Sequence, residues 1–497
     1  EENAPAVLAE ILEKGPDLEA VRDALALGID PRPSPERAAK MQAGWSAWEA
    51  EDSDGVTRPY QLYVPASVAE GSAMSALVVH LHGSVARADF GTGLGSPNAS
   101  GYASLLWPEL AERQGYVIAA PLGREDCVWW SDAGARHVRA VVRDVRRSLK
   151  VPDRSIFASG FSDGASGCYY LAMAAPDPFA GFIALNGHPA VAASASGKQL
   201  YLRNLRSSEL VAAATQEDSL YPSRTVFPHL ERAIRSGANV HFLSYPEINH
   251  QPLYFSEQSA LLTNFIENKK RKDDALEQRW LTSTADLGSV RRLRVLELGE
   301  GERDGAALEP HNVMTEAGRV SLGVRPSAQS TLIAEVFEGS AAARSGMLAG
   351  DRIVRFEGQA IDGLRGLRRA LREKSYGKSF QIHVQRGEEE IELSGSFGPF
   401  VSEPIYLRKD PTAHVDIQIK LSAAGGPRIE VSSFRVRRFE LGLPSAVGES
   451  SKLRARINGS EEELLVKERS VRELLTSFSV TGDAESLSAH YVDVRIE

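Results

Sequence analysis

One run of nine residues, FASGFSDGA at positions 157–165, constrains the fold more than any other part of the sequence. It joins an apolar, strand-like segment to a G-x-S-x-G turn and then to small residues that can open a helix. A serine on so sharp a strand-to-helix turn adopts strained backbone angles, and the strand and the helix crowd each other there. Gly160 and Gly164 are therefore expected to have no room for a side chain. The helix N-terminus behind Ser162 would offer N–H groups to a developing negative charge, which favours a nucleophilic serine.

A second strand-to-loop junction follows the aliphatic run 76–81, which ends in His82-Gly83-Ser84. A serine nucleophile on such a turn uses two backbone N–H groups to stabilise an oxyanion. One comes from the residue after the serine, and the other from a loop that follows an earlier strand. A glycine in that loop lets the backbone approach the substrate closely. We predict that the N–H groups of Ser84 and Asp163 form the oxyanion hole; an ordinary strand-to-loop turn is the alternative for the first loop.

A histidine base should come after the serine, because the chain order in such folds is serine, then acid, then histidine. His250 lies in the loop after the apolar strand expected at 240–245, which is where the base belongs. Another histidine, His188, follows the apolar run 182–185 but precedes any plausible acid, so we assign it to the wall of the pocket. His229 follows a proline typical of the first turn of a helix, so we expect a surface or packing residue, and His241 lies inside the strand 240–245, so we expect it to be packed.

The acid is expected one strand before the base. The run 210–215 has the pattern of a buried strand, and Glu217 and Asp218 lie in the loop that follows it. We predict that Asp218 orients His250 and stabilises the imidazolium that forms, with Glu217 as the alternative. Ser162, Asp218 and His250, each placed after its own strand, are jointly far more specific than any one of them.

With these residues in place, residues 43–270 resemble the α/β-hydrolase superfamily, and within it the polyhydroxybutyrate depolymerase, feruloyl esterase and dienelactone hydrolase-like proteins. The resemblance implies an α/β fold with a doubly wound sheet and a serine hydrolase that cleaves esters. The similar segments are RPYQLYVP at 58–65, the strand into His82-Gly83, CVWW at 127–130, Gly160 to Gly164, and APDPFAG at 175–181.

The CVWW segment departs from the family pattern, because those esterases usually carry Cys-Trp-Asn-Trp. Trp129 and Trp130 follow the strand that ends at Ala120, at the edge of the sheet where α/β proteins place their sites. Two adjacent side chains of an extended chain point in opposite directions. We therefore expect one tryptophan to pack inward and the other to meet substrate; packing of both in the core is the alternative.

Composition limits the kinds of partner. A formal net charge of −9 argues against a nucleic-acid-binding protein, which needs a basic face. No stretch has the apolar length of a membrane span. Neither cysteine has a companion cysteine or histidine at metal-ligand spacing, so no metal is expected. No cofactor is expected either. Cys127 and Cys168 could form a disulfide or remain buried thiols. The sequence starts at Glu1 without a methionine, from which we expect an exported protein, periplasmic, secreted or on the cell surface.

A second family signal spans residues 313–397. Its core is the phrase EGSAAARSGM at 338–347 followed by AGDRIV at 349–354, which closely resembles a PDZ domain of bacterial type. In such domains an extended peptide adds as a strand next to a helix. The resemblance implies that Leu322, Gly323 and Val324 offer backbone N–H groups to a peptide carboxylate. It also implies a groove lined by leucines of the following helix: Leu364, Leu367 and Leu371. A PDZ fold that only packs against its neighbour is the alternative.

At 497 residues the chain is too long for one core. Residues 398–497 alternate apolar and polar positions, and Asn458-Gly459 is a strong hairpin turn, which predicts a β-rich domain of sandwich type. The segment 290–296 could belong to it, which would make the PDZ domain an insertion. The expected parts are a helical segment 1–42, an α/β-hydrolase domain 43–272, a connection 273–312, a PDZ domain 313–397 and a β-rich domain 398–497.

The sequence favours a hydrolase of carboxylic esters that works through an acyl-enzyme. A serine peptidase with the same fold is the first alternative, because peptidases share the triad and PDZ domains often accompany bacterial proteases. A non-catalytic protein that binds a partner through the PDZ domain is the second. The expected ligands are an ester substrate and a peptide C-terminus.

Overall fold

The structure is a computed structural model. It describes residues 42–85, 102–149, 151–152, 154–246, 248–271, 276–300, 313–314, 320–327, 330–372, 374, 377–397, 404–405, 412–421, 426–444, 447, 451–471, 473–474 and 487–496. The helical segment predicted for residues 1–42 lies outside these ranges except for its last residue. The chain divides into two compact units, one made of residues 1–313 and 406–497 and the other of residues 314–405.

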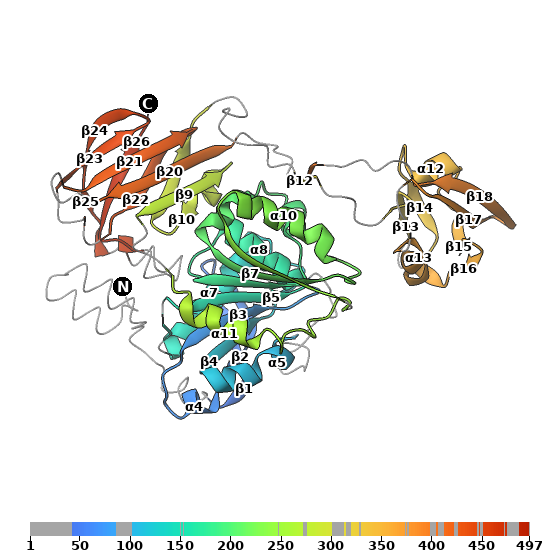
Figure 1. Ribbon diagram of the computed structural model, residues 1–497, viewed down its shortest axis with the longest axis horizontal. Helices are drawn as coiled ribbons and strands as arrows, with labels where there is room; N and C mark the ends of the chain where they lie inside the picture. Colours follow the sequence, from blue (N-terminus) through green and yellow to red (C-terminus); the bar gives the residue numbers. More distant parts are fainter. Residues whose placement is uncertain are drawn as a thin grey trace. The chain divides into compact units, whose positions relative to one another are not determined.

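The first unit contains an eight-stranded sheet in the order β1-β2-β4-β3-β5-β6-β7-β8 (Figure 1). β1 and β2 pair antiparallel, β2 pairs antiparallel with β4, and the other neighbours are parallel. Every residue of β3, β4 and β5 is buried, which explains why their sequences are nearly continuous apolar runs. The strands are β1 (Gly44–Glu51), β2 (Thr57–Val64), β3 (Ala76–Leu81), β4 (Tyr116–Pro121), β5 (Ile156–Phe161), β6 (Gly181–Leu185), β7 (Glu209–Thr215) and β8 (Asn239–Tyr245).

Helices cover both faces of this sheet (Figure 1). One core contains buried side chains of α7, α8 and α10, and a second core contains those of α6 and α11. We call this layered part, residues 44–271, the α/β region. Its helices are α4 (Ala66–Ala69), α5 (Ala103–Leu106), α6 (Pro108–Gln114), α7 (Asp132–Ser148), α8 (Asp163–Ala174), α9 (Pro189–Ser196), α10 (Ser223–Arg235) and α11 (Ser259–Asn268), with the 3-10 helix η1 (Leu202–Ser207).

Two five-stranded sheets in the same unit share one apolar core and form a sandwich. Their orders are β10-β11-β22-β26-β25 and β24-β23-β21-β20-β9. The hairpin predicted at Asn458-Gly459 joins β23 to β24, and both turn residues have positive φ, as a tight hairpin turn requires. The strands are β9 (Glu277–Thr282), β10 (Ser289–Val290), β11 (Leu293–Leu298), β20 (Ala413–Lys420), β21 (Arg428–Phe434), β22 (Val436–Gly442), β23 (Lys452–Ile457), β24 (Ser460–Leu465), β25 (Lys467–Glu468) and β26 (His490–Arg495).

The sandwich takes strands from two distant parts of the chain. β9 pairs with β20 and β11 pairs with β22, so the segment 277–298 completes both sheets. The α/β region contacts this segment through Asn204, whose side chain accepts a hydrogen bond from the Leu281 N–H and donates one to the Leu281 carbonyl. Residues 314–405 are therefore inserted between strands of a single sandwich.

The second unit has its own core, built from α12, α13 and short strands. The described sheets have the orders β13-β14 and β16-β15-β17-β18. Where the chain enters and leaves this unit, β12 (Val313–Met314) pairs with β19 (Pro404–Ile405). Its elements are β13 (Val324–Pro326), β14 (Ile333–Val336), α12 (Ala341–Ser345), β15 (Arg352–Phe356), β16 (Gln359–Ala360), α13 (Gly363–Arg372), β17 (Ser379–Arg386) and β18 (Glu389–Ser396).

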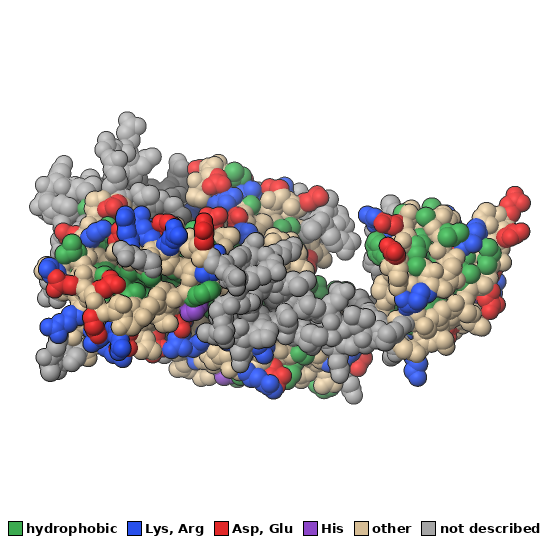
Figure 2. Space-filling view, turned by 90° about the horizontal axis from the view of Figure 1, so that it is seen from above, with side chains coloured by type: hydrophobic (Ala, Val, Ile, Leu, Met, Phe, Trp, Pro, Cys, Tyr) green, Lys and Arg blue, Asp and Glu red, His purple; other side chains and the backbone are tan. Residues whose placement is uncertain are grey.

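The described surface carries charges of both signs. On the face shown in Figure 2, acidic and basic side chains alternate with apolar ones. Salt bridges join many of them, such as Arg438 with Asp493 at 2.8 Å. Among the helices of the described residues, none is both long enough and apolar enough to span a membrane.

Candidate active site

Ser162 sits on the strand-to-helix turn that the sequence predicts. β5 ends at Phe161 and α8 begins at Asp163, so Ser162 is the N-cap of the helix, with φ 58° and ψ −118°. A Cβ on Gly160 would lie 2.2 Å from the carbonyl carbon of Gly164, and one on Gly164 would lie 1.8 Å from the Leu81 oxygen. Only glycine fits at either position, and the turn holds the serine in a conformation that is unfavourable outside this setting.

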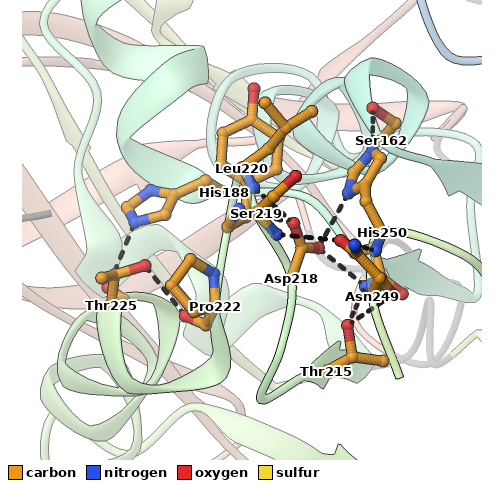
Figure 3. Close-up of polar contacts among 12 residues, drawn as sticks. Ser162, His188, Thr215, Asp218, Ser219, Leu220, Pro222, Thr225, Asn249 and His250 are labelled. Atoms are coloured by element: carbon orange, nitrogen blue, oxygen red, sulfur yellow. Dashed lines mark hydrogen bonds and ion pairs between the residues drawn. The ribbon is translucent and has the colours of Figure 1, made fainter. Parts of the chain in front are cut away.

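The structure brings Ser162, His250 and Asp218 together (Figure 3). The Ser162 Oγ lies 2.8 Å from His250 Nε2, and His250 Nδ1 lies 2.8 Å from Asp218 Oδ2. The Asp218 side chain is fully buried, whereas that of His250 is 17% exposed. Because Nδ1 faces a carboxylate, it carries the proton and donates, which leaves Nε2 to accept the hydroxyl hydrogen of Ser162.

Asp218 is held by more than the histidine. Its Oδ1 accepts hydrogen bonds from the N–H groups of Leu220 and Tyr221, and its Oδ2 also accepts one from the Asn186 side chain. Burial alone would raise the pKa of Asp218, but the hydrogen bonds from His250 and Asn186 outweigh it, so the pKa lies below its ordinary value. The alternative acid, Glu217, is exposed. Asp218 therefore stays ionised at neutral pH.

A hydrogen-bond network behind Asp218 was not predicted from the sequence. Asn186 Nδ2 donates to both Asp218 Oδ2 and Thr215 Oγ1, each at 2.8 Å, and the Tyr254 hydroxyl donates to Asn186 Oδ1. Asn186 has a positive φ of 52° directly after β6. Its place at the carboxyl end of a buried strand, like that of the triad residues, was the available signal.

The loop after β3 approaches Ser162 closely. A Cβ on Gly83 would lie 3.0 Å from the Ser162 Cβ, so any larger residue there would press against the nucleophile. His82 fixes this loop, because its Nε2 accepts from the Gly123 N–H at 3.0 Å and its Nδ1 donates to the Gly83 carbonyl at 2.7 Å. Burial lowers the pKa of His82 to about 4, so the ring is neutral.

The N–H groups of this loop face Asp163. The Val85 N–H donates to Asp163 Oδ2 at 3.1 Å. Burial raises the pKa of Asp163, while the Val85 N–H, the charge of His250 and the Ser84 N–H oppose the rise. The Asp163 side chain thus contacts the loop whose Ser84 N–H we assigned to the oxyanion hole. The side chain of the residue after the nucleophile ties the loop to the turn.

Trp129 and Trp130 differ in exposure. Trp129 is 1% exposed, and its Nε1 donates to the His82 carbonyl at 2.8 Å. It supports the loop beside Ser162 and offers no surface to a substrate, so of the two candidate substrate-binding tryptophans Trp129 is the one that packs inward. Trp130 is partly buried against the same core.

The His188 imidazole is directed away from the nucleophile (Figure 3). It is 8% exposed and caps α9, with Nδ1 accepting from the Ala190 N–H at 3.1 Å and Nε2 donating to the Thr225 carbonyl at 3.1 Å. In Figure 3 its imidazole points toward Thr225 and away from Ser162. Burial lowers the pKa of His188 to about 4. This residue holds the chain that follows Asp218, which corrects its assignment to the pocket wall.

The residues assigned to peptide binding lie in the second unit. Gly323 has φ +74°, its N–H donates to the Ser321 hydroxyl, and a Cβ would lie 2.3 Å from the Ser340 Cβ. Val324 pairs with Val336 in the two-stranded sheet. The side chains of Leu322 and Leu367 are 2% and 5% exposed and belong to the core, so Leu367 offers little surface to a groove. The helix positions left for a groove wall are partly exposed: Leu364 and Leu371.

Metal and thiol chemistry find no site in the described part of the chain. No group of three metal-ligating side chains occurs among these residues. Cys127 and Cys168 are both buried free thiols, and burial raises the pKa of Cys127 to about 11, so it is not a thiolate at neutral pH.

Comparisons with known proteins identify one family and several similar structures. A PDZ domain model matches residues 319–395. No curated protein matches the sequence. A thermostable esterase is 18% identical, with a TM-score of 0.35 over 46% of this chain and 63% of its own, so the chain spans less than two thirds of that protein. Esterase 2 of Thermogutta terrifontis is 17% identical over 45% and 94%, also with a TM-score of 0.35.

A peptidase is similar to the same extent. The acylaminoacyl peptidase of Pyrococcus horikoshii is 14% identical, with a TM-score of 0.35 over 46% of this chain and 42% of its own. The predicted order of an α/β-hydrolase sheet, a PDZ domain and a strand-rich C-terminal region is confirmed. The chain therefore combines an α/β-hydrolase fold with a PDZ domain.

Proposed function

We propose that this protein is a serine hydrolase that cleaves carboxylic esters through an acyl-enzyme. The observation that carries the proposal is the unbroken hydrogen-bond chain from Ser162 through His250 to Asp218, which starts at a strained turn and ends at a buried carboxylate. A buried carboxylate with a lowered pKa, paired to a histidine that reaches a serine, has the geometry of an activated nucleophile.

In the proposed reaction the Ser162 Oγ attacks the ester carbonyl while His250 Nε2 takes the hydroxyl proton. Asp218 stabilises the imidazolium that forms and keeps its Nδ1–H in place. The imidazolium then gives the proton to the departing alkoxide, which leaves as an alcohol. The acyl group stays on the serine as an acyl-enzyme. Water, deprotonated by the same histidine, releases the acid.

In this scheme the negative charge that develops on the carbonyl oxygen must be stabilised by hydrogen-bond donors. The Asp163 N–H lies at the N-terminus of α8, twelve residues long, where the helix dipole favours negative charge. The loop at Gly83 lies against Ser162 and is the second element close enough to contribute. The Ser84 N–H of this loop is the second donor in this scheme.

A covalent probe tests the proposal directly. We expect a fluorophosphonate to label Ser162 and p-nitrophenyl acetate to be hydrolysed, with both activities lost in Ser162→Ala. The Ser166→Ala variant is a matched control, because Ser166 lies one helical turn further on and is fully buried. Labelling that persists in Ser162→Ala would contradict the proposal.

A serine peptidase is the second candidate, and the PDZ domain in the same chain favours it, since such a domain can deliver a polypeptide. Peptide p-nitroanilides and p-nitrophenyl esters with the same acyl group separate the two. For an ester hydrolase, the ratio of kcat/KM for the ester to kcat/KM for the anilide should be much larger than the difference in chemical reactivity of the two bonds. For a peptidase, the ratio should not exceed that difference.

We further propose that the PDZ domain binds the C-terminus of a polypeptide. In the described part of this domain β13 pairs with β14 alone, which leaves its other edge available for an added strand. Gly323, immediately before β13, has the positive φ that lets the preceding loop turn back on itself.

A further inference from the structure

A hollow of about 310 Å³ lies at the edge of the eight-stranded sheet that is opposite the triad. The triad residues follow the carboxyl ends of parallel strands, whereas this hollow is lined by residues at the amino ends of β6, β7 and β8: Ala180, Glu209 and Gly237. Its other wall comes from β9 of the sandwich. The volume is within the range of small-molecule sites, and a ligand bound there does not reach Ser162.

The lining of this hollow is strongly cationic. Five of its side chains carry a positive charge and two carry a negative one, in a chain whose formal net charge is −9. One of the two carboxylates, Glu209, also faces a cation outside the lining, because its Oε2 lies 3.0 Å from Lys269 Nζ. Excess positive charge around a concavity focuses the field and attracts anions. The five cations are Arg206, Lys270, Arg271, Arg279 and Arg291.

Arg271 is the buried cation of the lining. Its side chain is 0% exposed, and its Nη2 lies 3.6 Å from Asp177 Oδ1. A charge-assisted hydrogen bond is shorter, about 2.7–2.9 Å, so this ion pair is a long one. Lys270, next to it in the chain, donates from Nζ to the neutral Ser155 hydroxyl at 2.7 Å. An anion in the hollow would bring a further negative charge to both cations, and buried charges are stable only when they are balanced.

Two arginines at the solvent side of the hollow repel each other. Partial burial and the positive charge of Arg279 lower the pKa of Arg206. The charge of Arg203 adds to this effect, while Asp416 and Glu277 oppose it. Since the pKa is lowered overall, the positive charges around Arg206 outweigh the carboxylates. A bound anion would reverse this balance.

We propose that this hollow binds a phosphate group, either of inorganic phosphate or of a small phosphate ester. Four of the five cations are arginines, whose planar guanidinium groups match the spacing of phosphate oxygens. A phosphate dianion also carries enough charge to offset most of the excess. It would contact strand ends of the α/β region and β9 together, so it would stabilise the attachment of the sandwich. The site goes beyond the proposed ester hydrolysis, since none of the triad residues takes part.

Thermal unfolding and isothermal titration of the full-length protein test the proposal. Sodium phosphate should raise the unfolding temperature, with a shift that grows with the logarithm of the concentration above the Kd. Sodium chloride at the same ionic strength should not, because it only screens charges. Glycerol 3-phosphate distinguishes the two sources. Tighter binding than inorganic phosphate would identify an ester as the ligand, and weaker binding would identify free phosphate; either result supports a phosphate site.

Substitutions in the lining give predictions of opposite sign. Arg206→Gln should weaken phosphate binding by about fivefold or more, the loss expected for a partly exposed charge-assisted hydrogen bond. Arg279→Gln should do the same and provides a second, independent variant. Glu277→Gln removes a carboxylate of the lining and should tighten binding by about two- to threefold. Arg456→Gln, exposed on β23 and outside the lining, is the matched control and should leave the Kd unchanged.

Two results would overturn the proposal. Equal stabilisation by phosphate and chloride would show a general effect of ionic strength. Equal effects of Arg206→Gln and Arg456→Gln, or weaker binding in Glu277→Gln, would show that phosphate binds elsewhere. Neither measurement depends on enzymatic activity, so the outcome is independent of whether the protein hydrolyses esters.

Discussion

The α/β region and the PDZ domain hold their candidate sites in opposite ways. Around Asp218 the polar groups are satisfied inside the protein, by two backbone N–H groups, an asparagine and a histidine. At β13 in the PDZ domain a described strand has one neighbour, so one row of backbone groups faces outward. One site is complete without a ligand, and the other would be completed by the peptide that we propose it binds.

The contrast teaches what each site can tolerate. A preorganised network spends no free energy on reorganisation during reaction, but any lost member leaves a buried polar group without its partner. A strand edge gains main-chain hydrogen bonds from almost any extended peptide, so its specificity must come from side-chain pockets and from the terminal carboxylate. Mutations should therefore act steeply in the first site and gradually in the second.

The largest effect is expected from Ser162→Ala. It should lower ester turnover by about 10⁶-fold, because removal of a triad nucleophile typically has that effect. Peptide binding by the PDZ domain should stay unchanged, as measured by fluorescence anisotropy with a labelled peptide. Turnover within tenfold of the parent would mean that another group is the nucleophile.

Asp218→Asn should lower turnover by about 10⁴-fold, because an amide no longer fixes the imidazole tautomer. The matched control is Glu217→Gln, a change to the exposed neighbour, which should have less than a twofold effect. Steady-state kinetics with p-nitrophenyl acetate measures both. The reverse ranking would assign the acid to Glu217.

Asn186→Ala should lower turnover by about 10- to 100-fold, the equivalent of one lost hydrogen bond to a charged group. Ser166→Ala provides a comparison at another buried polar residue, whose hydroxyl accepts from the His188 N–H and is not bonded to the acid. The two should lose similar thermal stability, and Asn186→Ala alone should lose most of its activity. Equal losses of activity in the two variants would mean that the Asn186 effect comes from general destabilisation and not from the lost hydrogen bond to the acid.

A C-terminal carboxylate should strengthen peptide binding to the PDZ domain by about tenfold or more. Backbone N–H groups before β13 would bind the charge, and amidation of the peptide removes it. Isothermal titration of free and amidated forms of one peptide with an apolar last residue measures the difference. Equal binding of the two would exclude carboxylate recognition.

Deletion of the PDZ domain should have the smallest effect. Replacement of residues 315–403 by a short Gly-Ser linker joins β12 to β19, which already pair. We expect kcat/KM for small soluble esters to stay within about twofold of the parent, since the triad residues lie in another unit. A loss of more than tenfold with the fold intact would show that the two sites communicate.

Much of the α/β region could be predicted from the sequence, because its central strands are buried on both faces and read as apolar runs. Ser162 and Asp218 each follow such a run, and His250 follows β8, the partly exposed last strand of the sheet; all three lie where the carboxyl ends of parallel strands meet. The glycines of the turn could also be predicted, because strand and helix meet so closely there that a side chain would not fit.

The network behind the acid could not be predicted, because Asn186 and Tyr254 meet only in the folded structure. His188 and Asn186 both follow β6. The neighbouring sequence does not distinguish a side chain that supports a loop from one that faces a substrate. Asp163 was expected to contribute only its N–H; its carboxylate reaches across to the loop after β3. Sequence patterns give the edge of a sheet but not the direction of each side chain.

The insertion of the PDZ domain has a consequence for synthesis. β9 and β11 leave the ribosome before the whole PDZ domain, and their partners β20 and β22 follow only after it. At about 5–20 residues per second, the early strands wait on the order of ten seconds for pairing. During this time apolar residues such as Trp280 and Val295 lack the second half of their core. The hydrogen bonds between Asn204 and Leu281 attach β9 to the α/β region, which is complete by then. The completed α/β region can thus hold β9 in place until the rest of the sandwich has been synthesised.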